Sequence, residues 1–459
     1  MSEQTITTPD HLKQPPLATG LPVLGNVLDL AQDTRGFLTK KYLEMGPIFR
    51  VRALNQEFVV LAGTEANLFM TRKGTKYFRS HEFWQGMDDE LGAARSMISM
   101  DGPEHVRFRK VQQKGYGRTV IWQHLPEIIA ITQNEMRQWP LNEPLPGLYS
   151  LQRIITEQLG ILAAGYSPRE YLDDMIKFVR IMLLTRVTKQ RPDLLRYTPS
   201  YRRARSRALD LAKNVRAVHP IETVHEREPD LIDHLLQLAH EYPDFLPESD
   251  LMPAILGPFI AGLDTVASTC AFLLYVLLTK PDILALVRQE ADDALFQKGT
   301  PIAQDLREMD VTHRVIQETL RMYPIAPALQ RTATQDFEFA GYQVKAGTAV
   351  IIATTAPHYL PELYPDPERF DIDRYTDERK EHKQPGTFAP FGLGAHTCLG
   401  AGWAEVQIMV TMLTIVHAVD LVMVPSDYEL KIDPAPTPSP NNDFQIKLMG
   451  WRQHGTLPG

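Results

Sequence analysis

The segment from Leu251 to Leu278 is the most apolar part of this 459-residue chain, and it limits what the chain can fold into. Such a run belongs either in a lipid bilayer or in the middle of a large protein core. Asp264 lies near its centre, and only 15 uncharged residues follow from Thr265 to Thr279, fewer than the roughly 20 needed to cross a bilayer. Pro253, Pro258 and Gly262 also interrupt the apolar region, and we therefore expect a buried core helix.

The composition supplies enough apolar residues to cover such a helix. Hydrophobic residues make up 44% of the chain and charged residues 23%, which is typical of a globular protein with a large core. The formal net charge of -8 gives no basic surface for nucleic acid. Because there is no internal repeat and no linker-like tract, we expect one domain over residues 1–459, with residues 1–15 as a flexible N-terminal tail.

The cysteines and the N-terminus indicate the compartment. Two cysteines, Cys270 and Cys398, cannot build a disulfide framework, which is typical of a protein from a reducing compartment. The N-terminus has no basic stretch followed by an apolar core, so it does not have the form of a secretory signal. These features predict a cytoplasmic protein without a transmembrane segment.

Hydrophobic periodicity predicts the fold class. Apolar residues recur mostly at helical spacing from about His105 to Phe296. Two shorter segments alternate between apolar and polar residues instead, and they predict a β-hairpin over Gly46–Gly63 and a small sheet over Asp336–Ala353. The predicted class is mainly α with small β-sheets, that is, α+β.

Cys398 lies in a glycine-rich segment, Phe391 to Gly400, directly before an apolar stretch that is expected to form a helix. The positive end of the helix dipole and the unpaired backbone N–H groups favour a thiolate at this position. Gly394 and Gly400 permit a tight, left-handed backbone that brings those N–H groups close to the sulfur. A thiolate held in this way is a soft ligand for iron, and a buried structural cysteine is the alternative.

Asp264 and Thr265 are an acid and an alcohol in the middle of the apolar helix, where burial is costly without a use. The threonine hydroxyl can donate to the carbonyl of Ala261, four residues back, and Gly262 permits a local widening that admits a water molecule. Together the two side chains could relay protons. The alternative is a helix kink with a satisfied polar pair.

Glu318 and Arg321 are three residues apart, so they share one face of a helix and can form an ion pair. Two environments are open for this pair. It is either a solvated surface pair, which contributes little to stability, or part of a buried network that is costly to break.

The chain resembles the cytochrome P450 superfamily from about residue 15 to its end. The residues that match the haem-binding signature of the family are Phe391, Gly394, His396, Cys398 and Gly400. Four further motifs follow in the family's order: His105-Val-Arg-Phe-Arg109 for a helix that holds a haem propionate, Ala261-Gly-Leu-Asp-Thr265 for oxygen activation, Glu318-Thr-Leu-Arg321 for the E-x-x-R helix, and Pro367-Glu-Arg-Phe370 for the segment whose arginine joins that helix.

The resemblance implies a P450 fold, with haem b buried between the long central helix and the helix after the cysteine loop. It implies Cys398 as the axial thiolate ligand of the iron. It also implies that Glu318, Arg321 and Arg369 form a buried structural network. The residues that the resemblance places around the haem, with cations to neutralise its propionates, are His105, Arg109, Arg331, His396, Phe391, Gly392 and Ala261.

The function implied by the resemblance is a haem-thiolate monooxygenase that activates O₂ reductively and inserts one oxygen atom into an apolar organic substrate. Asp264 and Thr265 would deliver the protons. Electrons would come from a ferredoxin or flavodoxin type donor with its reductase, which would meet Arg107, Lys110 and Lys114 unless these form only a solvated face. The residues expected to line an apolar substrate pocket are Phe83, Trp84, Met97, Ile260, Ala261, Ile325 and Leu329.

Two other kinds of haem protein stay open as alternatives. One senses or stores a ligand without turnover, and the other is an isomerase or dehydratase that rearranges an oxygenated lipid without external electrons. The acid and alcohol at Asp264 and Thr265 favour oxygenation, because neither alternative needs to deliver protons to dioxygen.

Overall fold

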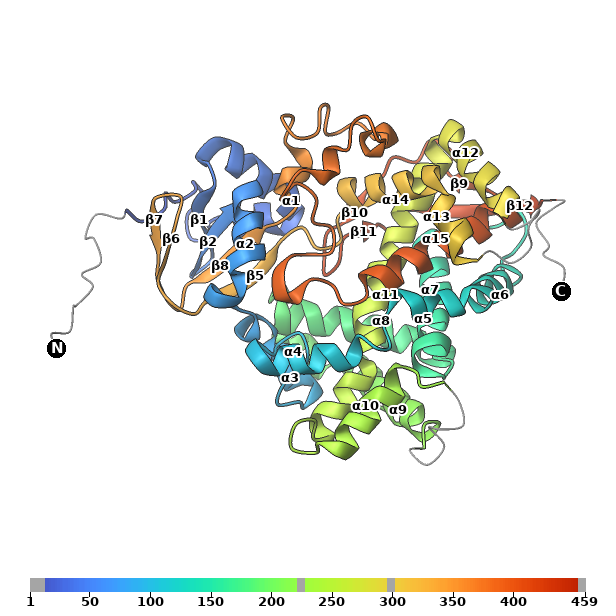
Figure 1. The fold of residues 1–459 in the computed structure, drawn as a ribbon, viewed down its shortest axis with the longest axis horizontal. Helices are drawn as coiled ribbons and strands as arrows, with labels where there is room; N and C mark the ends of the chain where they lie inside the picture. Colours follow the sequence, from blue (N-terminus) through green and yellow to red (C-terminus); the bar gives the residue numbers. More distant parts are fainter. Residues whose placement is uncertain (1–12, 221–227, 295–301, 453–459) are drawn as a thin grey trace.

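The computed structural model describes residues 13–220, 228–294 and 302–452. Helices make up most of these residues, and the largest sheet lies at one side of the molecule beside α1 and α2 (Figure 1). The fold is therefore helix-rich with small sheets, as the periodicity predicts.

The helices in chain order are α1 (Val27–Met45), α2 (Thr64–Tyr77), α3 (His81–Leu91), α4 (Gly102–Gln112), α5 (Arg118–Gln123), α6 (Leu125–Met136), α7 (Gly147–Ala164), α8 (Leu172–Met182), α9 (Pro199–Ala217), α10 (Leu231–Glu241), α11 (Glu248–Thr279), α12 (Pro281–Asp292), α13 (Ala303–Glu308), α14 (Asp310–Met322) and α15 (Ala401–Ala418). Nine of them, α4 to α12, fall within the stretch predicted to be helical, as far as residue 294. Phe296, the predicted end of that stretch, lies outside the described residues.

Helix α11 contains the apolar segment and crosses the middle of the molecule (Figure 1). It runs as one helix through Pro253 and Pro258, and the expected buried core helix is found. Tertiary burial outweighs the missing N–H groups here, because Ile255, Leu256 and Phe259 around the prolines are fully buried. Helices α7, α9, α10, α14 and α15 all pack against α11.

Two segments have the length and composition of membrane-crossing helices, α11 and the segment Gly394–Ala418 that contains α15. In each of them, 67% of the most apolar window is buried inside the protein. This burial is typical of core helices, and it agrees with the assignment of Leu251–Leu278 to the protein core.

The strands are β1 (Ile48–Ala53), β2 (Gln56–Ala62), β3 (Phe78–Arg79), β4 (Pro144–Pro146), β5 (Leu329–Ala333), β6 (Phe337–Phe339), β7 (Tyr342–Val344), β8 (Ala349–Ala353), β9 (Val419–Val424), β10 (Ile432–Asp433), β11 (Ser439–Pro440) and β12 (Gln445–Trp451). The predicted hairpin over Gly46–Gly63 is confirmed, since β1 and β2 pair antiparallel from Ile48 opposite Leu61 to Ala53 opposite Gln56.

The segment Asp336–Ala353 divides between two sheets. Strands β6 and β7 form a two-stranded hairpin, whereas β8 leaves it and enters the five-stranded sheet, whose order is β1-β2-β8-β5-β3. There β8 runs parallel to β2 and antiparallel to β5. This sheet fixes the position of β5, which carries Arg331.

Of the expected N-terminal tail, residues 1–12 lie outside the described residues. Residues 13–15 do not behave as a tail. Lys13 forms a bridge with Tyr342, and the carbonyl of Pro15 accepts a hydrogen bond from Arg50 Nε at 2.8 Å. These contacts tie the start of the described chain to β7 and β1.

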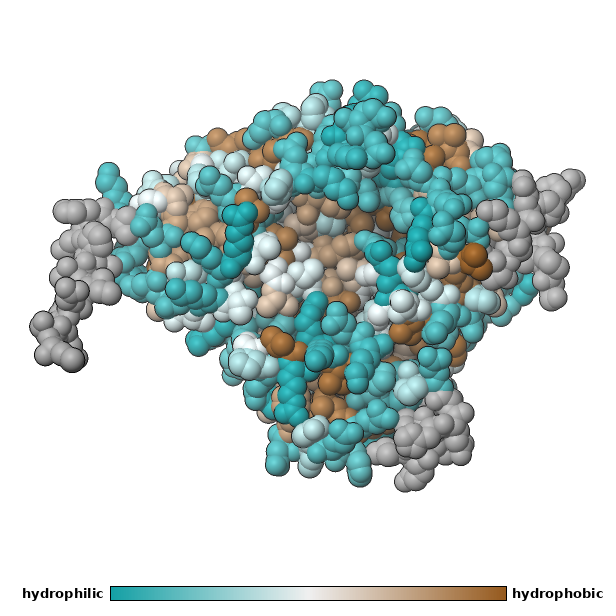
Figure 2. Space-filling view, in the orientation of Figure 1, coloured by the Kyte–Doolittle hydropathy of each residue, from teal (hydrophilic) through white to brown (hydrophobic). Residues whose placement is uncertain are grey.

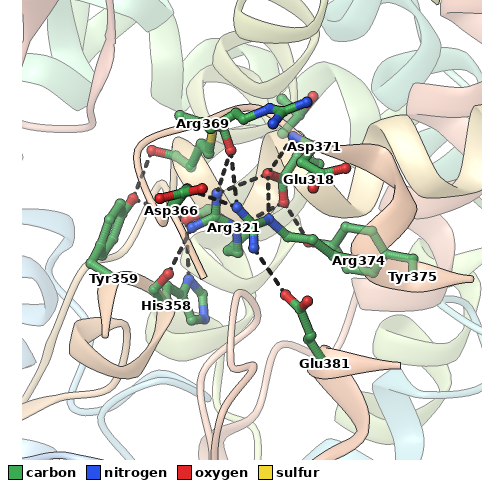
Figure 3. A network of polar contacts seen from close by, with 12 residues as sticks. Glu318, Arg321, His358, Tyr359, Asp366, Arg369, Asp371, Arg374, Tyr375 and Glu381 are labelled. Atoms are coloured by element: carbon green, nitrogen blue, oxygen red, sulfur yellow. Dashed lines mark hydrogen bonds and ion pairs between the residues drawn. The ribbon is translucent and has the colours of Figure 1, made fainter. Parts of the chain in front are cut away.

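Glu318 and Arg321 form the centre of a buried polar network on α14 (Figure 3). Both side chains are fully buried, which excludes the surface-pair alternative. Arg321 Nε donates to Glu318 Oε2 at 2.7 Å, and Arg321 Nη2 donates to Oε1 at 2.8 Å. The remaining acceptor capacity of the carboxylate is filled by the backbone N–H of Asp371 and the hydroxyl of Tyr375, each at 2.9 Å.

The second arginine of this network is Arg374, and the prediction of Arg369 is wrong. Arg374 is fully buried and donates to Glu318 Oε1 at 3.3 Å and to Glu381 Oε2 at 2.9 Å. Arg369 is exposed, and it contributes only its backbone carbonyl; no dashed line reaches its guanidinium in Figure 3. The reason is the 3₁₀ turn Ile372–Tyr375, which packs on α14 and turns its arginine inward.

His358 connects the network to the chain that leads to Cys398. Its Nδ1 donates to the carbonyl of Arg321 at 3.2 Å, so its Nε2 accepts the backbone N–H of Ala389 at 3.0 Å. Burial lowers the pKa of His358 to about 3, which keeps the imidazole neutral and suited to both bonds. The network thus anchors the irregular run before the cysteine loop to α14.

We predict that Arg374→Met lowers the free energy of unfolding by about 3–5 kcal/mol, because the buried carboxylate of Glu318 loses one of its two arginine partners. The matched control, Arg369→Met, removes an exposed guanidinium and is expected to change that free energy by less than about 0.5 kcal/mol. Urea denaturation of the two variants measures the difference. Equal losses would contradict the assignment of Arg374.

Candidate active site

The loop before α15 holds Cys398 through its backbone. The N–H of Cys398 donates to the carbonyl of Phe391 at 2.8 Å, and the helix begins three residues later at Ala401. Gly392 and Gly394 have φ values of 71° and 75°, in the left-handed region that favours glycine. Gly400 has a φ of -86°, so the expected left-handed backbone is found at Gly394 and not at Gly400.

The electrostatics of the two cysteines separate their roles. Cys270 is fully buried in α11, and burial raises the pKa of its thiol, which makes it unreactive. Burial also raises the pKa of Cys398, and the backbone N–H of Gly400 and the charge of Arg109 offset this only in part. The side chain of Cys398 is nevertheless exposed. A metal cation deprotonates a thiol that coordinates it, so this accessible sulfur fits iron.

Arg331 on β5 is a buried cation with few partners. Its exposed fraction is 5%, and its Nη1 donates to the carbonyl of Gln330 at 2.7 Å. Within the described part of the chain, its Nε has no hydrogen-bond partner. Burial lowers the pKa of Arg331 to about 10, although the charge of Asp101 acts against this. A buried guanidinium in this state fits a carboxylate ligand, such as the propionate of a haem.

His396 and His105 lie together, with their ring centroids 4.1 Å apart. His396 Nε2 is 3.1 Å from Asp101 Oδ1 and 3.2 Å from Ser80 Oγ. Asp101 also accepts the backbone N–H of Ser80 at 2.9 Å. Burial alone would raise the pKa of Asp101, but the bonds from His396 and Ser80 outweigh it and lower that pKa.

His105 is neutral at pH 7 because burial, followed by the charge of His396, lowers its pKa to about 4. A neutral imidazole can donate to a carboxylate but cannot neutralise it. Arg109 is half-exposed on the same helix, and burial lowers its pKa while the charge of Cys398 raises it. The structure therefore brings Arg109 and Cys398 together, and places His105 and His396 with Asp101.

On the other side of the candidate site, α11 carries the acid and the alcohol. Thr265 Oγ1 donates to the carbonyl of Ala261 at 2.7 Å, as predicted. Asp264 Oδ1 accepts a hydrogen bond from Gln152 Nε2 at 2.8 Å. Burial raises the pKa of Asp264, and Gln152 and Arg180 lower it only in part.

Gly262 has a different use from the one expected. A Cβ at this position would lie 2.7 Å from Leu159 Cδ1, so the leucine side chain would have to shift to make room for it. The missing side chain therefore allows α7 and α11 to pack tightly, and no widening for a water molecule follows from it.

The predicted pocket residues share one property, which is partial exposure in spite of their apolar side chains. Ala261 is exposed in the middle of α11, although Phe259 and Leu263 beside it are fully buried. The others are half-buried: Phe83, Trp84, Met97, Ile260, Ile325 and Leu329. Helix α3, which carries Phe83 and Trp84, packs against β5, which carries Leu329. Figure 2 shows pale and brown surface in the centre of the face where the loop before α15 lies.

Four residues of this arrangement were not predicted from the sequence: Ser80, Asp101, Gln152 and Arg374. Their partners are distant in the chain, for example Gln152 with Asp264 and Asp101 with His396. Asp101 does precede a helix, where an aspartate normally caps, but its side chain makes no such cap. No local signal could identify these contacts.

Comparison with known proteins gives consistent matches over the chain. The family model described as Cytochrome P450 matches residues 167–448. A cytochrome P450 120 from Synechocystis sp. is 27% identical over 448 residues, which cover 96% of this chain and 99% of that protein. Abscisic acid 8'-hydroxylase 4 from Arabidopsis thaliana is 28% identical over 411 residues, which cover 87% of this chain and 84% of that protein. A solved structure of retinoic acid bound cyanobacterial CYP120A1 has a TM-score of 0.81 and 26% identity, and the match covers 96% of this chain and 100% of that one.

We predict that Arg331→Met lowers the haem content of the purified protein at least severalfold, because a buried propionate would lose its cation. Arg50→Met is the matched control, since Arg50 lies in the same sheet and pairs with Glu57 at the surface. Haem content is measured by the pyridine haemochrome assay. Full retention in Arg331→Met would contradict the role of this arginine.

Proposed function

Because this chain belongs to the cytochrome P450 family, whose members are haem-dependent monooxygenases, we propose that it inserts one oxygen atom from O₂ into an apolar organic substrate. Electrons come from separate redox proteins, and residues 1–459 act as one domain. The observation that carries the proposal is the loop Phe391–Gly400, which presents Cys398 directly before α15.

The proposed haem contacts follow from the donors at the site. Cys398 would ligate the iron, and a haem with a thiolate ligand would supply reductive activation of O₂. Arg331 and Arg109 would neutralise the propionates, and His105 would donate a hydrogen bond to them as a neutral imidazole. His396 orients Asp101 and Ser80 at this edge. Phe391, Gly392 and Ala261 would provide apolar contact with the haem.

Asp264 and Thr265 deliver the protons in the proposed reaction. Burial raises the pKa of Asp264, which suits a group that must gain as well as lose a proton. The hydroxyl of Thr265 donates to the Ala261 carbonyl, which leaves its oxygen able to accept a hydrogen bond from a donor on the pocket side. Relay through this pair explains why two polar groups are retained in an apolar helix.

For the substrate, we propose an apolar organic acid. The half-buried apolar residues of the pocket favour a hydrocarbon body. The names of two similar proteins contain abscisic acid and retinoic acid, which makes apolar acids the first compounds to screen. Binding can be detected as a change in the spin state of the haem, seen in its absorption spectrum.

We further propose that a ferredoxin or flavodoxin type donor, supplied by its reductase, docks at α4 in the cytoplasm. Lys110 and Lys114 are exposed there and can meet an acidic partner. Arg107 is less suited than expected, because its guanidinium stacks on the rings of Tyr242 and Phe245 at 4.3 Å. The surface for the partner therefore centres on the two lysines.

The reaction is tested through the two cysteines. Cys398→Ser is expected to abolish both product formation and the red-shifted Soret band of the reduced carbon monoxide complex, whereas Cys270→Ser retains both, because Cys270 is buried in the core. Product formation by the unaltered protein is expected to need O₂ and a reduced electron carrier. Turnover without them would favour the isomerase alternative, and ligand binding without any turnover would favour the sensor.

Thr265→Ala is expected to increase the peroxide released per electron pair severalfold, because reduction of O₂ continues while proton delivery fails. Thr269→Ala is the matched control, since Thr269 Oγ1 makes the same intrahelical bond one turn later, to the carbonyl of Thr265 at 2.9 Å. The ratio of product to consumed NAD(P)H measures the coupling. Unchanged coupling in Thr265→Ala would overturn the relay.

A further inference from the structure

A cleft of about 220 Å³ lies outside the candidate active site, between the first turns of α7, the start of α8 and the chain near Asn441. Its wall contains polar groups from all three segments, among them Tyr149, Gln152, Asp173 and Asn441. Asp173 is exposed, and its Oδ1 accepts a hydrogen bond from the hydroxyl of Tyr149 at 2.8 Å. The cleft is therefore open to water and polar at its rim.

Gln152 connects this cleft to the active site. Its exposed fraction is 6%, it forms part of the cleft wall, and its Nε2 donates to Asp264 Oδ1 at 2.8 Å. Asp264 Oδ2 accepts no hydrogen bond from the residues that the structure describes, and the carboxyl group is half-buried. Gln152 thus lies between the cleft and a carboxyl group with one free oxygen.

The close packing of α7 on α11 makes this contact possible. Gly262 lets Leu159 of α7 approach the backbone of α11, and Gln152 lies two turns before Leu159 on the same face of α7. The amide of Gln152 therefore reaches Asp264 from a rigid helix and not from a loop.

We propose that this cleft supplies the water that reprotonates Asp264, and that Gln152 is the positioning residue that holds Asp264 toward the cleft. The inference rests on the proposed function, because it names the source of protons for the same reaction. Each proton that leaves Asp264 for the active site is replaced by one from a hydronium ion in the cleft. An O–H bond forms at Oδ2, an O–H bond of the hydronium ion breaks, and neutral water returns to the solvent.

The charges that face Asp264 are consistent with this route. Arg180 of α8 lies within electrostatic range of Asp264, and its guanidinium pairs with Asp433 at 2.7 Å. The amide of Gln152 donates to the carboxylate and so stabilises its ionised form, which burial disfavours. Loss of the amide should therefore raise the pKa of Asp264 further, which makes the contribution of Gln152 measurable without turnover.

The first experiment is an infrared titration of the resting holoenzyme. The C=O stretch of the protonated Asp264 carboxyl is assigned by its loss in Asp264→Asn. We expect Gln152→Met to raise the midpoint of this band by about one pH unit, a tenfold change in the proton affinity. Gln158→Met is the matched control, because Gln158 is a buried amide on the same helix that bonds Thr132, Gln407 and Thr411 instead.

An unchanged midpoint in Gln152→Met would overturn the positioning role. Gln152→Asn keeps an amide but shortens its reach, so we expect it to raise the midpoint as well. It serves as the test variant if Gln152→Met does not fold. Since the titration involves no substrate and no electrons, its outcome does not depend on whether the protein oxygenates the proposed substrate.

The second experiment tests the cleft itself. Ile176→Trp narrows the cleft from the α8 side without touching the bond between Gln152 and Asp264. We expect an unchanged infrared midpoint, slower hydrogen–deuterium exchange of the Asp264 carboxyl, and at least a twofold increase in peroxide released per product. Unchanged exchange would overturn the cleft as the source of protons. Water would then reach Asp264 from another side, such as the Arg180–Asp433 pair.

Discussion

The site depends first on one buried carboxylate, that of Glu318. A fully buried charge is tolerated only when hydrogen bonds replace its hydration, and here two arginines, a tyrosine hydroxyl and a backbone N–H do so. These partners come from α14 and from the run between residues 366 and 381, which has no long helix or strand. The carboxylate thereby gives a fixed shape to a segment that could not hold one through regular backbone hydrogen bonds. The next part of the chain is the loop that presents Cys398.

A second constraint is the use of α11 as a wall shared by the core and the site. Its buried residues pack against helices on several sides, whereas Ala261, Asp264 and Thr265 keep some exposure. Gly262 determines how closely α7 approaches this wall. The same close packing that stabilises the core also brings Gln152 to Asp264. The turn of α11 that contains Gly262 and Asp264 therefore serves both the packing and the proposed proton transfer.

Local features were predictable from the sequence, and contacts between distant segments were not. The hairpin of β1 and β2 and the bond from Thr265 to Ala261 depend on nearby residues, and both were predicted correctly. Helix α11 was predicted as a buried helix, and it continues through Pro253 and Pro258 because burial outweighs their cost. Arg369 was taken for Arg374 because the two arginines are close together in the chain and Arg369 lies in the Pro367–Phe370 motif, and only the 3₁₀ turn decides which of them faces inward. The net rise in the pKa of Cys398 depends on surroundings that no motif specifies.

The parallel pairing of β2 with β8 has a consequence for how the protein is made. Val59 pairs with Val350, so the two strands are separated by most of the chain. A ribosome has to release nearly all of that intervening chain before the pair can close, and the entropy of closing so long a loop has to be offset at that moment. Strand β5 lies on the far side of β8 and is positioned by the same closure. The arginine on β5 therefore reaches its place late in synthesis, and insertion of the prosthetic group should be a late, largely post-translational event in the life of this protein.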